Sequence, residues 1–185
     1  MKKSFIITIA LFLALATVQA RPGQDGKSGN GETVKEMKSG RIPLHKLEGN
    51  NVSEMAKNNF NTDFPNVSDL HWKRNGTFDE ASFIKAGKQM TAFYDYEGNL
   101  VGSTRAAKLS ELPEAAQNEI KTRYKGYKIG PVIFFKDNES NATDMILYGV
   151  QFDDADTWLV ELRKGAEGIV VQVLKDGEVS YFTRL

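Results

Sequence analysis

The chain contains no cysteine and only two histidines. Without cysteine there are no disulfides, no thiol nucleophile and no thiolate ligand for a metal. His45 and His71 stand far apart in the sequence, which argues against a zinc site. The chain also lacks a glycine-rich phosphate loop, a nucleophile-elbow motif and a metalloprotease motif. We therefore expect no catalytic residue, no metal and no cofactor, and we predict that the protein is not an enzyme.

The chain also has no excess of charge of either sign, because its 24 basic residues are balanced by 24 acidic ones. Proteins that bind nucleic acid or an anionic membrane surface usually carry a basic field. One basic cluster occurs, in residues 121–128, but it lies at the end of an expected helix, where cations stabilise the helix dipole. We expect no nucleic-acid partner.

Long hydrophobic runs are absent after residue 20, so the beginning of the chain stands out. It reads MKKSFIITIALFLALATVQA, a short basic start, an apolar run and small residues at the end. This pattern is typical of a cleaved secretory signal peptide, and the run is shorter than the ~20 apolar residues of a spanning helix. Cleavage removes two lysines and no acid, which leaves a formal charge of −2. We predict a periplasmic or secreted protein with no membrane attachment after cleavage.

The mature chain divides by composition into a polar lead and two similar halves. Residues 21–51 are rich in Gly, Lys, Glu and Asn, a composition that favours a flexible segment. Residues 52–108 and 109–185 each begin with a helical pattern and continue with strand patterns separated by turns. Their apolar helix positions are spaced by fours and match at an offset of sixty: Ala56, Phe60 and Phe64 with Ala116, Ile120 and Tyr124.

The last strands of the two halves are also alike. The stretch YDYEGNLVG at residues 94–102 and the stretch VLKDGEVSY at residues 173–181 both contain two strand segments around an acidic-glycine turn. We predict an α+β fold of two tandem helix-plus-four-strand repeats, which form a largely antiparallel sheet with the helices on one face. Residues 145–152, MILYGVQF, are expected to be one additional strand of the second half.

A set of short motifs connects the first helix, the strands after it and the start of the second helix: Phe64-Pro65, Trp72, Tyr94-Asp95, Gly98-Asn99, Leu112-Pro113, Gln117 and Ile120. With these motifs the chain resembles a known family, the secreted PepSY-like, beta-lactamase-inhibitor-like proteins of Gram-negative bacteria. The resemblance covers about residues 52–128 well and implies a repeated helix-plus-sheet fold, a location in the cell envelope and a role in binding or inhibiting proteins. Because a fold does not fix a function, the role stays an expectation.

Aromatic residues on the expected strands supply the candidate binding residues. Several strands carry bulky side chains on both faces, although a sheet covered by helices on one side needs only one apolar face. The side chains belong either to the core and to scattered surface positions, or to an open sheet face that binds a protein. The candidates for protein binding are Tyr94, Tyr96, Trp158, Tyr148 and Phe152.

The leading hypothesis is a non-enzymatic, monomeric binding protein that inhibits or modulates an envelope enzyme, with an unidentified envelope protein as partner. A small-ligand carrier is one alternative and needs an enclosed pocket between sheet and helices. An unrecognised enzyme is another, and it needs Asp95, Glu97 or Asp156 together in one buried pocket.

The acidic stretch DDAD at residues 153–156 provides a first test, because carboxylates are the ligands that calcium prefers. The alternating ligands, central glycine and distal glutamate of a calcium loop are missing, so we interpret it as a polar turn. Calcium should leave the melting temperature unchanged in thermal unfolding. A rise of several degrees would contradict this interpretation.

Overall fold

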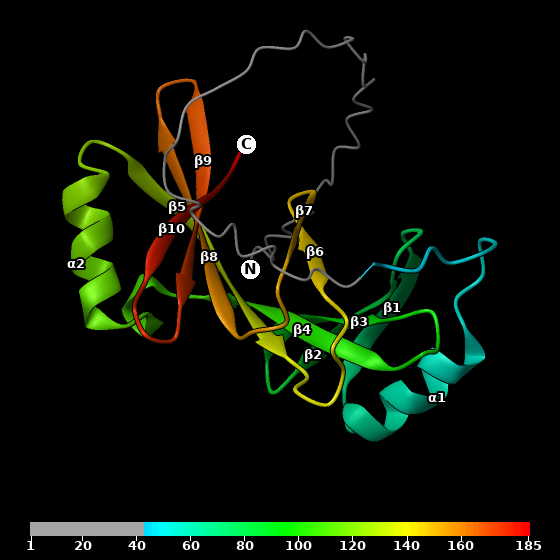
Figure 1. Cartoon of the computed structure of the whole chain (residues 1–185). Helices are drawn as coiled ribbons and strands as arrows, with labels where there is room; N and C mark the ends of the chain where they lie inside the picture. The colour runs from blue at the N-terminus through cyan, green and yellow to red at the C-terminus, as the bar shows by residue number, and fades with distance from the viewer. Residues whose placement is uncertain (1–42) are drawn as a thin grey trace, which may run out of the picture. The chain divides into compact units, whose positions relative to one another are not determined.

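The computed structural model describes residues 43–185, which form an eight-stranded sheet, two helices and a separate two-stranded hairpin (Figure 1). The sheet has the strand order β1-β2-β3-β4-β5-β8-β9-β10, and all neighbouring strands are antiparallel. The α+β class is therefore confirmed. The elements are α1 (Glu54–Asp63), β1 (Ser68–Arg74), β2 (Asp79–Lys85), β3 (Lys88–Tyr94), β4 (Leu100–Ala107), the 3-10 turn η1 (Leu109–Glu111), α2 (Glu114–Arg123), β5 (Lys128–Asp137), β6 (Met145–Leu147), β7 (Val150–Phe152), β8 (Thr157–Lys164), β9 (Glu167–Leu174) and β10 (Val179–Arg184).

Helix α1 forms where the spacing of apolar residues predicts it. The hydroxyl of Ser53 accepts a hydrogen bond from the backbone N–H of Met55 at 3.2 Å, which satisfies one of the unpaired donors of the first turn. Ala56 and Phe60 are buried against the sheet. The ring of Phe60 meets that of Phe83 on β2 edge-on, with 5.0 Å between ring centroids.

Helix α2 also forms where the spacing of apolar residues predicts it, but no side chain of the described residues caps its first turn. Pro113 takes the N-cap position, and Lys121 and Arg123 lie in the last turn, where positive charge stabilises the helix dipole. Ala116 and Ile120 are buried, as their spacing predicts. The core beneath this helix is formed by apolar side chains of β5, β8, β9 and β10: Val132, Val160, Leu162, Ile169, Val171, Val173 and Val179.

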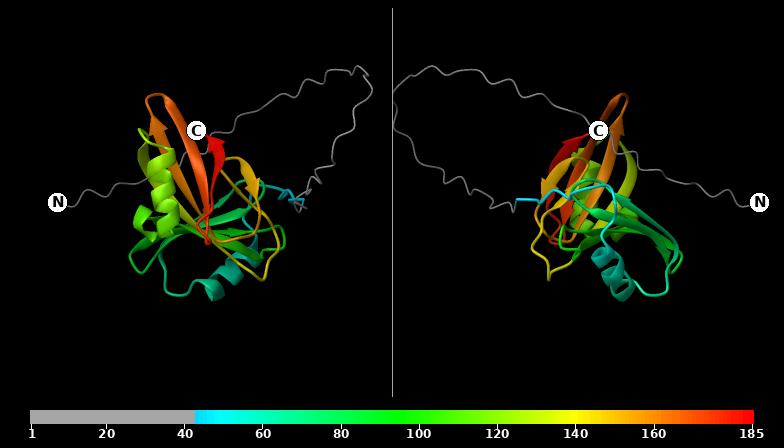
Figure 2. Two further views of the ribbon diagram at one scale, coloured as in Figure 1. Left: turned by 60° about the vertical axis from the view of Figure 1, so that its left-hand side comes forward. Right: turned by 90° about the vertical axis from the view of Figure 1, so that its right-hand side faces the viewer.

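Both helices pack on the same face of the sheet. Cross-strand partners point to the same side, and the pairs Met90–Arg105, Arg105–Phe134 and Phe134–Trp158 run without a break from β3 to β8. Met90 packs against the core under α1, and Trp158 packs against the core under α2. Figure 2 shows that the sheet bends, with the helices on the outer side and the hairpin on the inner side.

The inner side is covered by the β6–β7 hairpin, which corrects the expectation of one strand at residues 145–152. The chain turns back at Tyr148 and Gly149, whose φ angles of 52° and 75° are typical of a two-residue hairpin turn. Each half of the described chain therefore has a helix followed by four strands of the main sheet, and the hairpin interrupts the second half between β5 and β8.

Aromatic packing fixes the hairpin to the sheet. The ring of Phe152 lies 5.4 Å from that of Phe135 on β5 and 5.6 Å from that of Phe182 on β10. Met145 of the hairpin is fully buried in the same cluster. The sheet thus has an apolar core on each face, which explains why its strands carry bulky residues on both sides.

The predicted signal peptide at residues 1–20 and most of the predicted lead at residues 21–51 lie outside the described residues. Residues 43–51 contain no helix or strand, and the backbone N–H of Leu47 donates to the carbonyl of Gly76 at 2.8 Å. Within residues 43–185, neither helix has the length and apolar character needed to cross a membrane.

A close approach of strands β4 and β5 depends on Gly102. A Cβ atom at this position would lie 2.6 Å from the carbonyl oxygen of Lys136 and 2.6 Å from the ring of Phe135. Both distances are far below van der Waals contact, and the carbonyl belongs to the neighbouring strand, which cannot move by itself.

We expect Gly102→Ala to lower the free energy of unfolding by about 1 to 3 kcal/mol, because the added methyl group overpacks the core. Urea unfolding measures this difference. Ser103→Ala on the same strand is the control and should change the free energy by less than about 1 kcal/mol. Equal effects of the two substitutions would contradict the close approach at Gly102.

Candidate functional site

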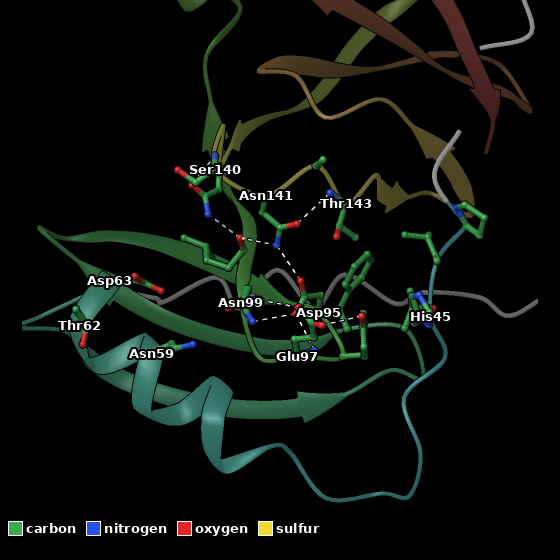
Figure 3. A pocket seen from close by; sticks show the side chains of 18 residues that line it. His45, Asn59, Thr62, Asp63, Asp95, Glu97, Asn99, Ser140, Asn141 and Thr143 are labelled. Atoms are coloured by element: carbon green, nitrogen blue, oxygen red, sulfur yellow. Dashed lines mark hydrogen bonds between the residues drawn. The ribbon is translucent and has the colours of Figure 1, made fainter. Parts of the chain in front are cut away.

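A pocket of about 590 Å³ lies at the end of the sheet where the β3–β4 turn projects (Figure 3). Its walls come from five segments that are distant in sequence: the strand-free residues before α1, helix α1, the β1–β2 turn, the β3–β4 turn and the loop after β5. The residues that line it are Pro43, Leu44, His45, Asn59, Thr62, Asp63, Thr77, Phe78, Asp95, Tyr96, Glu97, Asn99, Leu100, Asn138, Ser140, Asn141, Ala142 and Thr143.

The β3–β4 turn is built around the carboxylate of Asp95. Its Oδ1 accepts hydrogen bonds from the backbone N–H groups of Glu97 and Asn99, both at 2.9 Å. The backbone N–H of Gly98 donates to the carbonyl of Asp95 at 3.0 Å, and Gly98 has a φ of 80°. The local sequence DYEGN therefore determines this turn, because Asp bonds its own backbone and Gly tolerates positive φ.

The loop after β5 is joined to the same turn by two asparagines. Asn141 Nδ2 donates to Asp95 Oδ2 at 2.9 Å and to the carbonyl of Leu100 at 3.1 Å. Asn138 Nδ2 donates to that same carbonyl at 2.7 Å. The sequence alone does not mark Asn138 and Asn141 as part of a site, because no local pattern shows which distant carbonyl a side-chain amide reaches.

Helix α1 closes the pocket from the other side. Asn59 Nδ2 donates to the carbonyl of Gly98 at 2.8 Å. A Cβ atom at residue 98 would lie 2.8 Å from the backbone nitrogen of Ala56, so only glycine permits this approach of turn and helix. The hydroxyl of Tyr94 donates to Asp63 Oδ2 at 3.0 Å. Burial, together with the Asp63 carboxylate, raises the pKa of Tyr94 well above its ordinary value.

An exposed aromatic pair lines the pocket. The rings of His45 and Tyr96 have centroids 4.1 Å apart and planes inclined by 32°. Tyr96 is 49% exposed, and its hydroxyl donates to Glu97 Oε1 at 2.8 Å. Tyr96 is therefore an accessible aromatic surface beside a carboxylate, a combination that binds cationic and polar groups.

The charged side chains of the lining are acidic, namely Asp63, Asp95 and Glu97, and no lysine or arginine is among the lining residues. The remaining lining groups are mostly amides and hydroxyls. Such a pocket presents many acceptors and favours ligands with positive charge or with several hydrogen-bond donors.

Two of the five predicted binding residues are buried, which corrects the expectation that they lie on an open sheet face. Tyr94 is fully buried and packs against Phe60 and Trp72. Phe152 is 5% exposed and belongs to the inner core. The physical reason is that the sheet has covered faces on both sides, so strand alternation alone could not identify a free one.

The other three predicted residues lie apart from one another. Trp158 is half-buried on the helix side of the sheet, 4.9 Å from the ring of Phe134, and its indole N–H is buried without a hydrogen-bond partner. Tyr148 is half-buried in the β6–β7 turn, and its hydroxyl donates to Glu161 Oε1 at 3.0 Å. Among the five candidates, Tyr96 is the one that lines the pocket.

The enzyme alternative needed acidic groups together in a buried pocket, and the structure brings Asp95 and Glu97 together while Asp156 lies in another hollow. However, the oxygens of Asp95 accept three hydrogen bonds, and Glu97 is exposed to solvent. A general acid or base must direct a proton-binding oxygen at the substrate. This arrangement suits recognition of a ligand more than proton transfer.

The acidic stretch at residues 153–156 connects β7 to β8. Asp156 Oδ2 lies 3.0 Å from Lys136 Nζ and 2.9 Å from Lys175 Nζ, so two ammonium groups occupy its surroundings. In the described part of the chain, no three histidine or acidic side chains are grouped so that they hold a metal ion.

Comparison with solved structures identifies the same fold in proteins of Bacteroides. A DUF2874 family protein from Bacteroides uniformis has a TM-score of 0.59 at 13% identity, over 71% of this chain and 89% of that one. A BLIP-like protein from Bacteroides fragilis has a TM-score of 0.56 at 14% identity, over 79% and 89%. A protein from Bacteroides eggerthii whose name assigns it to the periplasm has a TM-score of 0.58 at 13% identity, over 72% and 91%.

At these identities the likeness shows a shared fold and does not transfer a function. No protein-family model matches the chain, and no curated protein matches it either.

We expect Asp95→Asn to lower the free energy of unfolding by about 2 kcal/mol. The neutral amide forms weaker hydrogen bonds than the carboxylate, and its NH₂ group is a donor that faces another donor, Asn141 Nδ2. Guanidinium unfolding measures the change. Glu97→Gln removes an exposed acid from the same turn and should cost less than about 0.5 kcal/mol. A neutral Asp95→Asn variant would show that the carboxylate does not hold the pocket together.

Proposed function

We propose that the mature chain is an exported, non-enzymatic binding protein of the periplasm or cell exterior. Its partner is a protein of the cell envelope, and binding inhibits or modulates that partner. The protein acts as a monomer, and the pocket beside Tyr96 is the centre of its binding surface.

The observation that carries this proposal is the pocket and the way its walls are fixed. Asp95, Asn138, Asn141 and Asn59 connect three separate segments by hydrogen bonds, so the pocket is formed before any ligand arrives. A preformed site loses little conformational entropy on binding. Tyr96 lines it and is exposed, and tyrosine is among the residues that most often dominate the energy of protein interfaces.

The fold supports the same proposal. A BLIP-like protein and a protein named as periplasmic share it at low identity. The sequence resemblance to PepSY-like, beta-lactamase-inhibitor-like proteins agrees with an envelope location. We further propose that residues 52–108 and 109–185 are tandem repeats of one helix-plus-four-strand unit, in accord with the shared order of their elements.

The charge of the pocket indicates the chemistry of the partner. Its exposed acidic groups are Asp63 and Glu97, and Tyr96 adds an aromatic face. A lysine or arginine side chain in an exposed loop of the partner fits this combination, because it pairs with carboxylates and stacks on an aromatic ring.

A small polar ligand is the second candidate, and the size of the pocket favours it. A volume of about 590 Å³ lies within the range of small-molecule sites. Native mass spectrometry of the purified mature protein separates the two: a co-purified mass that disappears on denaturation supports a carrier of small ligands.

The test of the leading proposal is a crosslinked pull-down from the native envelope with tagged residues 21–185 as bait. We expect one enriched protein, and we expect the Tyr96→Ser variant to lose this capture. The enriched protein should bind the Tyr96→Ser variant with about thirtyfold lower affinity, as for an interface residue that contributes about 2 kcal/mol. Tyr181→Ser is the matched control, since Tyr181 is 59% exposed on strand β10 and does not line the pocket.

Capture that survives Tyr96→Ser, or that is lost equally with Tyr181→Ser, would contradict a binding surface centred on the pocket. Circular dichroism of each variant establishes that the bait is folded. No enriched protein with a folded bait would overturn the protein-binding role.

A further inference from the structure

The segment that walls the pocket and covers the inner face of the sheet begins and ends at a pair of aspartates. Strand β5 ends at Asp137 and strand β8 begins at Thr157, so the intervening residues 138–156 form one excursion from the main sheet. Its first residues line the pocket, and its hairpin packs in the inner core. The two ends of this segment meet at Asp137 and Asp156, which we call its base. There the backbone N–H of Asp137 donates to Asp156 Oδ1 at 2.8 Å. The two ends are therefore joined through a carboxylate.

The base of this segment is crowded with charge. Lys136 of β5 and Lys175 of the β9–β10 turn both contact Asp156. Asp154 lies on the same stretch as Asp156, Glu139 follows Asp137 in the loop, and Asp176 follows Lys175. These acidic residues line a second hollow of about 400 Å³ together with Asp137.

Asp137 is the least satisfied group of this cluster. It is 6% exposed, and its Oδ1 is buried without a hydrogen-bond partner. Burial, followed by the charges of Asp154 and Asp156, raises the pKa of Asp137 to about 6, although the Asn138 backbone N–H and Lys136 act in the opposite direction. The pKa of Asp156 shifts in the opposite direction. Burial acts to raise it, but hydrogen bonds from Lys175, the Asp137 N–H and Lys136 outweigh burial and lower the pKa of Asp156.

We propose that the proton on the buried carboxyl of Asp137 controls how firmly residues 138–156 close over the sheet, and thereby the wall of the pocket. The closure itself depends on contacts within this chain, whereas its effect on a ligand rests on the proposed binding function. When Asp137 is protonated, the base holds one buried charge fewer, and the repulsion with Asp154 and Asp156 is gone. When Asp137 is ionised, an unpaired buried oxygen carries charge and the segment opens more often.

The direction of the pH effect follows from the difference between the pKa of Asp137 in the closed segment and in an open, solvated one. The closed segment binds the proton more tightly. The proton therefore stabilises the closed segment below about pH 4, and this stabilisation disappears as the pH rises through about 6. For an ordinary aspartate value near 3.9 in the open form, the opening constant increases about tenfold between pH 5 and pH 7.

Hydrogen–deuterium exchange of the mature protein, without any partner, tests this proposal. After correction for intrinsic exchange, we expect backbone amides of residues 138–152 to lose about tenfold protection from pH 5 to pH 7 relative to amides of β2 and β3. Asp137→Asn, a neutral mimic of the protonated group, should keep the protection high at both pH values. Glu139→Gln removes an exposed acid of the same base and should keep the pH response of the native protein.

A native segment with the same pH response as β2 and β3 would overturn the proposal, as would a full response that survives Asp137→Asn. If Asp137→Asn does not fold, Asp154→Asn takes its place; it removes one repelling charge and should reduce the response, and an unchanged response contradicts the proposal. Because no partner is present, a clear pH response together with a failed pull-down would reject the binding function and leave this inference standing.

Discussion

The carboxylate of Asp95 is the interaction on which the pocket depends. One of its oxygens accepts two backbone N–H groups of its own turn, and the other accepts the amide of Asn141. It thereby joins a local turn to a loop that is 46 residues distant along the chain. Charged acceptors form stronger hydrogen bonds than neutral ones, and a buried carboxylate without partners is costly. A single side chain can therefore hold two segments in a fixed relation.

The two covered faces of the sheet determine which surfaces remain free. Helices α1 and α2 bury the outer face, and the β6–β7 hairpin buries much of the inner one. The pocket is consequently formed at the end of the sheet, by turns, loops and residues of helix α1. Loops on a rigid scaffold are a common place for binding residues. Tyr96 is exposed because it lies in such a turn, while Tyr94, two residues earlier on β3, is core.

Asp95 and Asp137 show how the environment decides the role of an aspartate. Both are nearly buried, at 5% and 6% exposure, and both stand at a strand end. Asp95 is fully engaged in hydrogen bonds, which makes it a structural anchor. Asp137 has an oxygen without a partner, and burial, followed by the charges of Asp154 and Asp156, raises the pKa of Asp137 above its ordinary value. The residue type is the same, and the groups around each carboxyl differ: N–H groups of its own turn and Asn141 surround that of Asp95, whereas the carboxylates of Asp154 and Asp156 act on that of Asp137.

Local chemistry was enough to determine much of this protein from its sequence. Ser53 caps α1, the fourfold spacing of Ala56 and Phe60 places them in the core, and the acidic-glycine turns separate the strands. These features depend on neighbours in the chain, so periodicity and turn residues report them directly. The α+β class and the placement of both helices on one face followed from such patterns.

Only the tertiary structure decided what depends on long-range contact. The turn at Tyr148-Gly149 lies within a run of residues that resembles one strand. The two halves of this run form a hairpin that is buried on the inner face of the sheet, a long-range contact that the sequence does not show. The asparagines of the pocket wall and the burial of Tyr94 were also beyond the sequence. An amide bonds whichever carbonyl the fold brings to it, and alternation along a strand gives two faces without saying what covers each of them.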